Sequence, residues 1–212
     1  MNVKVDLKRE LDCYRAPRAR FRLLEVPPME YLMIDGHGDP NSAPAFRDAI
    51  DALYPLAYAL KFASRREHGR DYVVPPLEGL WSAADMAAFT TARDKSHWDW
   101  TLLMLVPEWL GPDEVEAAAD AVRAKGEQAG TVPGRLGDIR CELLDEGLCV
   151  QTLHVGAFDD EGPVLAELHE RFIPEQGLRM TGRHHEIYLS DARRVEPARR
   201  RTILRQPVER VA

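Results

Sequence analysis

Three polar residues with two-residue spacing, His184, Glu186 and Tyr188, are the first candidates for chemistry in this sequence. Successive side chains of a β-strand alternate between its faces, so these three share one face. His185 and Ile187 lie on the other face, which we expect to be apolar. A carboxylate flanked by an imidazole and a phenol suits acid–base work. The alternative is a solvent-exposed face on which the carboxylate is simply hydrated.

A weak internal repeat supplies a second carboxylate. The segment 77–80 aligns with 185–188, which places Glu78 near the position that Glu186 occupies in the other half of the chain. Two carboxylates that face one cleft repel each other, and burial adds to this effect, so the pKa of at least one is raised. The repeat therefore predicts that Glu78 and Glu186 face a shared cleft.

Aromatic residues gather on the predicted elements of the first half. Trp98 and Trp100 share one face of a strand that follows the strand carrying Trp81, and Tyr54 and Tyr58 are one helical turn apart. Indole and phenol rings arranged in this way can form a flat apolar cage for a planar or cationic ligand. The alternative is ordinary core packing, the usual role of tryptophan.

Other motifs give weaker signals. His154 precedes the turn at Gly156 and can reach the same cleft, although a lone strand histidine is more often a hydrogen-bonded structural residue. The adjacent His184 and His185 point in opposite directions and cannot chelate one metal, and the cysteines form no C-x-x-C pair. Walker, dinucleotide and G-x-S-x-G fingerprints are also lacking. We therefore expect neither a metal nor a cofactor.

The elements that must position these residues form two similar modules of strand, helix, strand and strand. The modules span residues 20–110 and 137–208, joined by a helix and linker over 111–136 within a single domain, 1–212. Two such modules pack most simply as a twisted antiparallel sheet with helices on one face and a ligand groove at the pseudo-twofold seam, an α+β fold.

Local patterns predict several of these elements. Apolar residues from Phe46 to Leu60 recur every three or four positions and predict a helix that Pro55 must kink or restart and that Gly69 ends. We also expect a strand over 71–81. The strands over 139–144 and 148–155 flank a short turn, and this spacing predicts a hairpin.

Composition limits the class of protein. The chain has 212 residues, of which 45% are hydrophobic and 30% charged, as in ordinary globular proteins. It shows neither the apolar core of a signal peptide nor a run long enough to span a bilayer, and its three cysteines form no disulfide framework, so we expect a cytoplasmic protein. The net charge of −7 disfavours direct nucleic-acid binding by the whole surface.

One basic stretch departs from this acidic balance. Arginines near the C-terminus either form a patch for phosphates or acidic ligands or, as we favour, a solvated rim that offsets acidic neighbours. They are Arg193, Arg194, Arg199, Arg200, Arg201, Arg205 and Arg210.

Several blocks together resemble the GyrI-like small-molecule-binding family. They are the aromatic helix 46–62, Pro76–Trp81, Trp98–Thr101, His184–Asp191 and Ile203–Val208, and the similarity extends over about 29–208. The resemblance implies two strand-helix-strand-strand modules around a ligand groove, with Glu186 as the groove glutamate. One departure is Ser82, which replaces a second tryptophan after Trp81.

Relatives in this family include effector-binding domains of multidrug-responsive transcription activators, gyrase-inhibitory proteins, and stand-alone enzymes that hydrolyse cyclopropane-bearing DNA-alkylating antibiotics. The chain resembles the stand-alone branch, which implies detoxification of drugs and other xenobiotics. Two alternatives are a non-catalytic binding module for hydrophobic cationic drugs and a gyrase-inhibitor-like interaction protein.

The resemblance and the residues together give a hypothesis with named roles. Trp81, Trp98, Trp100 and Tyr58 hold a planar strained electrophile, with Tyr54 and His154 as further contacts. Glu186 deprotonates the attacking water, and Tyr188 or a protonated Glu78 stabilises the developing phenolate.

Overall fold

The computed structural model describes residues 4–83 and 94–211. The elements of its first half are the short helix α1 (Leu7–Glu10), strands β1 (Arg22–Val26) and β2 (Met29–His37), the long helix α2 (Pro44–Glu67), strands β3 (Glu78–Ala83) and β4 (Trp98–Leu105), and helix α3 (Pro112–Ala129).

The second half repeats much of this order. It contains strands β5 (Arg140–Leu144) and β6 (Gly147–Val155), helix α4 (Gly162–Ala166), a π-helical segment (Glu167–Phe172), helix α5 (Ile173–Glu175), and strands β7 (Leu178–Met180), β8 (His184–Tyr188) and β9 (Arg201–Arg210).

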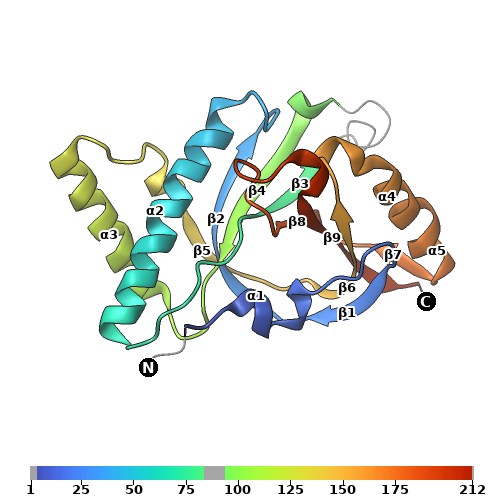
Figure 1. Cartoon of the computed structure of the whole chain (residues 1–212), viewed down its shortest axis with the longest axis horizontal. Helices are drawn as coiled ribbons and strands as arrows, with labels where there is room; N and C mark the ends of the chain where they lie inside the picture. The colour runs from blue at the N-terminus through green and yellow to red at the C-terminus, as the bar shows by residue number, and fades with distance from the viewer. Residues whose placement is uncertain (1–3, 84–93, 212) are drawn as a thin grey trace.

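The strands form one curled antiparallel sheet of nine strands, and the fold is α+β as predicted. Its order is β1-β6-β9-β8-β3-β4-β2-β5, with β7 attached to β9. Strands β9, β6 and β1 follow outward from β8, and strands β4, β2 and β5 follow outward from β3, so the two halves of the sheet correspond. The β8–β3 pair joins these halves. Figure 1 shows α2 beside α3 at one end and α4 with α5 at the other.

Two apolar clusters hold the helices on one face of the sheet. Leu53 and Leu60 of α2 pack with Leu102 and Met104 of β4. Leu168, in the segment after α4, packs with Val150, Val208 and their neighbours. The groove between the helices therefore lies over the β3–β8 seam, as predicted.

The opposite face is covered by the N-terminal segment. Cys13 and Tyr14 pack there against Leu80, Ile187 and Ile203. Two faces of the same strands thus have different environments, so the direction of each β3 or β8 side chain decides whether it lines the groove or the second core.

Three local expectations are corrected. Helix α2 does not restart at Pro55 but runs unbroken through it, because this residue lies on the exposed face, where solvent can satisfy the carbonyl that loses its amide partner. Strand β3 begins only at Glu78, since Pro75 and Pro76 before it lack the N–H of a ladder.

The third correction concerns the predicted hairpin. Strand β5 pairs with β2, and β6 pairs with β1 and β9, so β5 and β6 are not partners. Between them the buried Glu146 carboxylate binds Arg205, and Gly147 adopts a φ of +57°. The chain therefore changes direction here and passes from one half of the sheet to the other.

Candidate functional site

A cavity of about 490 Å³ opens over the β3–β8 seam. Its floor is formed by strand residues and its walls by α2, by the short turn of 3₁₀ helix Phe158–Asp160, and by the loop after β8. The principal lining side chains are Phe46, Ile50, Tyr54, Tyr58, Trp81, Lys95, Trp98, Phe158, Glu161, Glu186 and Tyr188.

A chain of hydrogen bonds fixes the acidic group on the floor. The Tyr188 hydroxyl donates to Glu186 Oε2 at 2.8 Å, and Trp81 Nε1 donates to the Tyr188 oxygen at 3.1 Å. Strand alternation places Glu186 and Tyr188 on the same face, and pairing of Gly79 with Glu186 brings β3 alongside. The carboxylate is thus held in one orientation by two neighbouring strands.

Burial changes the acidity of this group. The Glu186 side chain is only 13% exposed, and its desolvation raises the pKa to about 7, although the hydrogen bond from Tyr188 acts in the opposite direction. Burial also lowers the pKa of the neighbouring His184 to about 3. At neutral pH Glu186 therefore lies beside an uncharged imidazole and can accept or release a proton.

A second carboxylate in the cavity was not predicted. Glu161 is 4% exposed, and burial together with the charge of Glu186 raises its pKa to about 10. It lies just after the turn at Gly156–Asp159, where neither strand alternation nor a helical stripe indicates which way it points. Lys95 and Phe158 were missed for the same reason.

Glu78 does not face this cavity. It is fully buried on the opposite face of the sheet, where it accepts hydrogen bonds from Tyr14 and from His185 Nε2, the latter at 2.9 Å. Gly79, one residue later, is the residue that pairs with Glu186. A shift of one residue along a strand moves a side chain to the other face of the sheet. The expected Glu78–Glu186 pair is therefore wrong, and the second carboxyl of the cavity is Glu161.

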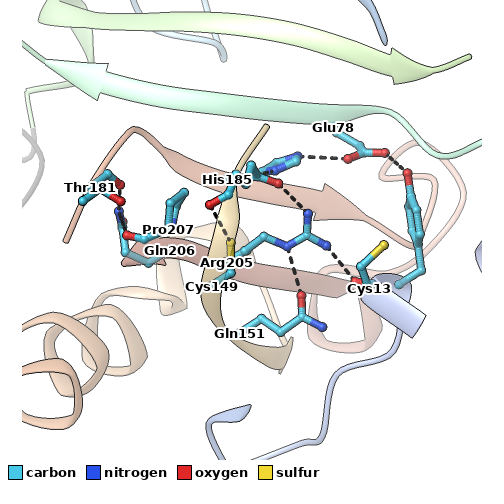
Figure 2. A network of polar contacts seen from close by, with 11 residues as sticks. Cys13, Glu78, Cys149, Gln151, Thr181, His185, Arg205, Gln206 and Pro207 are labelled. Atoms are coloured by element: carbon cyan, nitrogen blue, oxygen red, sulfur yellow. Dashed lines mark hydrogen bonds and ion pairs between the residues drawn. The ribbon is translucent and has the colours of Figure 1, made fainter. Parts of the chain in front are cut away.

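The face that carries Glu78 is not wholly apolar, contrary to the sequence prediction. His185 bridges Glu78 and Glu146, and Arg205 donates to Glu146 Oε2 at 2.7 Å. Figure 2 shows a hydrogen bond from each nitrogen of the Arg205 guanidinium, with Gln151 and the Cys13 carbonyl as further acceptors. Each buried charge in this network thus has a partner.

Aromatic rings form one wall of the cavity. Phe46 stacks over Trp81 at 6.1 Å between ring centroids, and Trp98 meets Trp81 edge-on at 5.6 Å. Trp100 lies below this wall, 1% exposed, with its Nε1 donating to the Gly38 carbonyl. Trp81 and Trp98 therefore line the cavity, whereas Trp100 belongs to the core, and the predicted cage uses Phe46 in its place.

The two predicted tyrosines lie at the mouth of the cavity. Tyr54 and Tyr58 stack along α2 at 6.5 Å between centroids, and Tyr58 is 46% exposed. His154, by contrast, is not among the lining residues, since its Nε2 lies 3.1 Å from the Ala157 carbonyl and holds the turn. The structural interpretation of His154 therefore fits this geometry.

The C-terminal arginines do not form one patch. Arg193 and Arg194 reach the cavity mouth and pair with Asp191, in agreement with a rim that offsets acidic neighbours. Arg205 was also assigned to this rim, but it is fully buried in the core network. Strand β9 is buried from Thr202 to Val208 because both of its faces are covered, and Arg205 lies on the face of the core network.

Within residues 4–83 and 94–211, no cluster of three or more His, Cys, Asp or Glu side chains is arranged to hold a metal ion. No helix in the same ranges is long and apolar enough to cross a membrane.

Comparison with known proteins places this geometry in a family. The model of the GyrI-like small molecule binding domain matches residues 124–208. A crystal structure of an uncharacterized conserved protein from Listeria innocua is 35% identical, with a TM-score of 0.85, and the match covers 97% of this chain and 100% of the other. The chain belongs to the GyrI-like family.

Further structures extend the comparison of this GyrI-like protein. A hydrolase from Listeria innocua is 34% identical, with a TM-score of 0.82 and coverage of 97% of this chain and 100% of that one. The C-terminal domain of EcmrR shares the fold at 15% identity and a TM-score of 0.56, over 91% of this chain and 98% of that domain. No curated protein matches the sequence.

Proposed function

We propose that this GyrI-like protein binds flat drug-like molecules and hydrolyses strained electrophiles among them, such as spirocyclopropyl cyclohexadienones. The observation that carries the proposal is Glu186, a largely buried carboxyl with a pKa of about 7 beside an aromatic wall. A carboxylate in this pKa range is suited to act as a general base near neutral pH. A similar protein of known structure, 34% identical, is described as a hydrolase.

The roles of the lining residues follow from their positions. Trp81, Trp98 and Phe46 hold the flat ring by stacking, with Tyr54 and Tyr58 at the entrance. Ionised Glu186 orients a water and takes its proton as the oxygen attacks the cyclopropane carbon.

Tyr188 keeps the base in place in this scheme. Its hydroxyl donates its hydrogen to Glu186 and accepts one from Trp81, so it orients the carboxylate. Glu78 lies on the other face of the sheet. The oxygen released on ring opening therefore needs a donor other than Glu78.

Mass spectrometry of a cyclopropane-bearing dienone incubated with the protein tests the proposal. We expect a product heavier by one water. Glu186→Gln should retain ligand binding and lose about 10²–10⁴-fold in rate, whereas the exposed Glu170→Gln is the matched control. Equal turnover by wild type and Glu186→Gln rules out Glu186 as the base.

The second candidate is a binding module without catalysis for hydrophobic cations. The same cavity favours it, because the Glu186 carboxylate attracts a cation by its charge and the indole rings attract it through their π faces. A dienone that is bound but recovered unchanged would support this function over hydrolysis.

A further inference from the structure

Glu161 is the buried carboxyl of the cavity to which the reaction above assigns no role. Glu161 is 4% exposed, and its Oε1 atom has no hydrogen-bond partner within residues 4–83 and 94–211. Its side chain nevertheless lines the cavity together with Glu186. Glu161 thus lines the cavity and carries a buried oxygen that no hydrogen bond of these residues satisfies, and such a group calls for a functional explanation.

The charged groups around Glu161 come from several elements. Lys95 binds Asp159 at 2.7 Å at the edge of the cavity, so its charge is already shared. On β8 the nearest groups are the Glu186 carboxylate and the Tyr188 phenol, with the uncharged His184 behind them. The charged groups at the mouth are Asp6, Lys8, Asp191, Arg193 and Arg194.

We propose that Glu161 is the proton donor of this site, acting on the ligand oxygen while Glu186 acts on water. The proposal rests on the hydrolysis proposed above. The water oxygen bonds to the cyclopropane carbon and gives one proton to Glu186. The breaking carbon–carbon bond sends its electron pair into the ring, and the former carbonyl oxygen takes a proton from Glu161 as the phenol forms. Transfer of a proton from Glu186 to Glu161 restores the site, and the net change is addition of one water.

The protonation states support this division of roles. Burial and the neighbouring Glu186 raise the pKa of Glu161 to about 10, so it carries a proton at pH 8. Glu186, with a pKa of about 7, is mostly ionised there. Two carboxyl groups whose environments separate their pKa values can serve as acid and base at one pH.

Infrared difference spectroscopy on the ligand-free protein tests the protonated state. At pH 8 we expect a protonated-carboxyl band in the wild type and in the exposed control Glu170→Gln, and its loss in Glu161→Gln. A band that persists in Glu161→Gln, or a wild type without one, overturns the proposal whether or not the protein is a hydrolase.

Turnover tests the donor role itself. We expect Glu161→Gln to bind the dienone as the wild type does and to lose about 10²–10⁴-fold in rate, with partial rescue by Glu161→Asp. If the wild type turns over and Glu161→Gln matches it at every pH, the donor role alone is wrong. If the wild type shows no turnover, the donor role fails together with the proposed hydrolysis.

Discussion

His185 and Glu186 are consecutive residues of β8, yet their side chains lie on opposite faces of the sheet. His185 bridges Glu78 and Glu146 in a buried ionic network, whereas Glu186 lines the aromatic cavity. The positive charge of His185 lowers the pKa of Glu186, against the larger effect of burial. The core network and the cavity are thus linked through one strand.

The pH dependence of turnover should reflect both cavity carboxyls. The rate requires ionised Glu186 and protonated Glu161, so it should rise through about pH 7 and fall through about pH 10. Values of kcat/KM, which report the ligand-free protein, measured across this range check the profile. A rate that decreases from pH 6 to pH 8 would contradict the assignment of Glu186 as the base.

Tyr188→Phe should move the lower limb of this profile. The Tyr188 hydrogen bond stabilises ionised Glu186, so its loss should raise the pKa of that carboxyl above about 7. The midpoint of the lower limb should therefore shift to higher pH, with the ligand still bound. An unchanged midpoint would show that Tyr188 does not act on Glu186.

The free energy of unfolding should fall as pH rises because of Glu161. Its pKa is raised in the folded protein from 4.5 to about 10, so the folded state binds more protons than the unfolded state between these values. The stabilisation from protonation is complete below pH 4.5 and is lost as pH rises toward 10. Urea unfolding at several pH values should give a flatter dependence for Glu161→Gln than for wild type or Glu170→Gln.

Glu146→Gln should destabilise the fold strongly. Although burial opposes ionisation, His185 and Arg205 lower the pKa of Glu146 to about 2, and removing its charge leaves those cations buried without it. We expect a loss of about 3–5 kcal/mol in the free energy of unfolding. A double variant, Glu146→Leu with Arg205→Met, should lose less than the sum of the two single changes, as measured by chemical denaturation.

Substitution of Trp98 should affect ligand binding, whereas substitution of Trp100 should affect folding stability. Trp98→Ala removes part of the cavity wall and should weaken binding of a flat aromatic ligand by about 1 kcal/mol or more. Trp100→Ala empties a core position and should cost about 3–5 kcal/mol of folding stability. Calorimetric titration and thermal unfolding of both variants check the contrast, and the reverse pattern would contradict the cavity described here.

Local sequence patterns predicted those features that depend on neighbouring residues. The apolar stripe of α2 and the alternation of His184, Glu186 and Tyr188 are local, and both are confirmed. Alternation also correctly separates Glu186 from His185. The α+β class followed from the order of strands and helices, which the sequence shows directly.

Features that depend on pairing between distant segments were not predictable in the same way. The β5–β6 hairpin failed because strand partners are chosen across the sheet rather than along the chain. Glu78 was misplaced because a repeat alignment cannot resolve the one-residue register that sets its face. Glu161 lies after a turn in a segment without periodicity, so only the three-dimensional arrangement brings it to Glu186.

The exchange of leading strands has a consequence for fragments of this protein. Strand β1 opens the first half of the chain but pairs with β6 of the second, and β5 opens the second half but pairs with β2 of the first. A cut in the loop after α3 would leave each piece with one strand that lacks its partner and with an unpaired hydrogen-bonding edge. Neither piece should be monomeric by itself, whereas a mixture of the two should reassemble, which makes this loop a natural place to split the molecule into complementing parts.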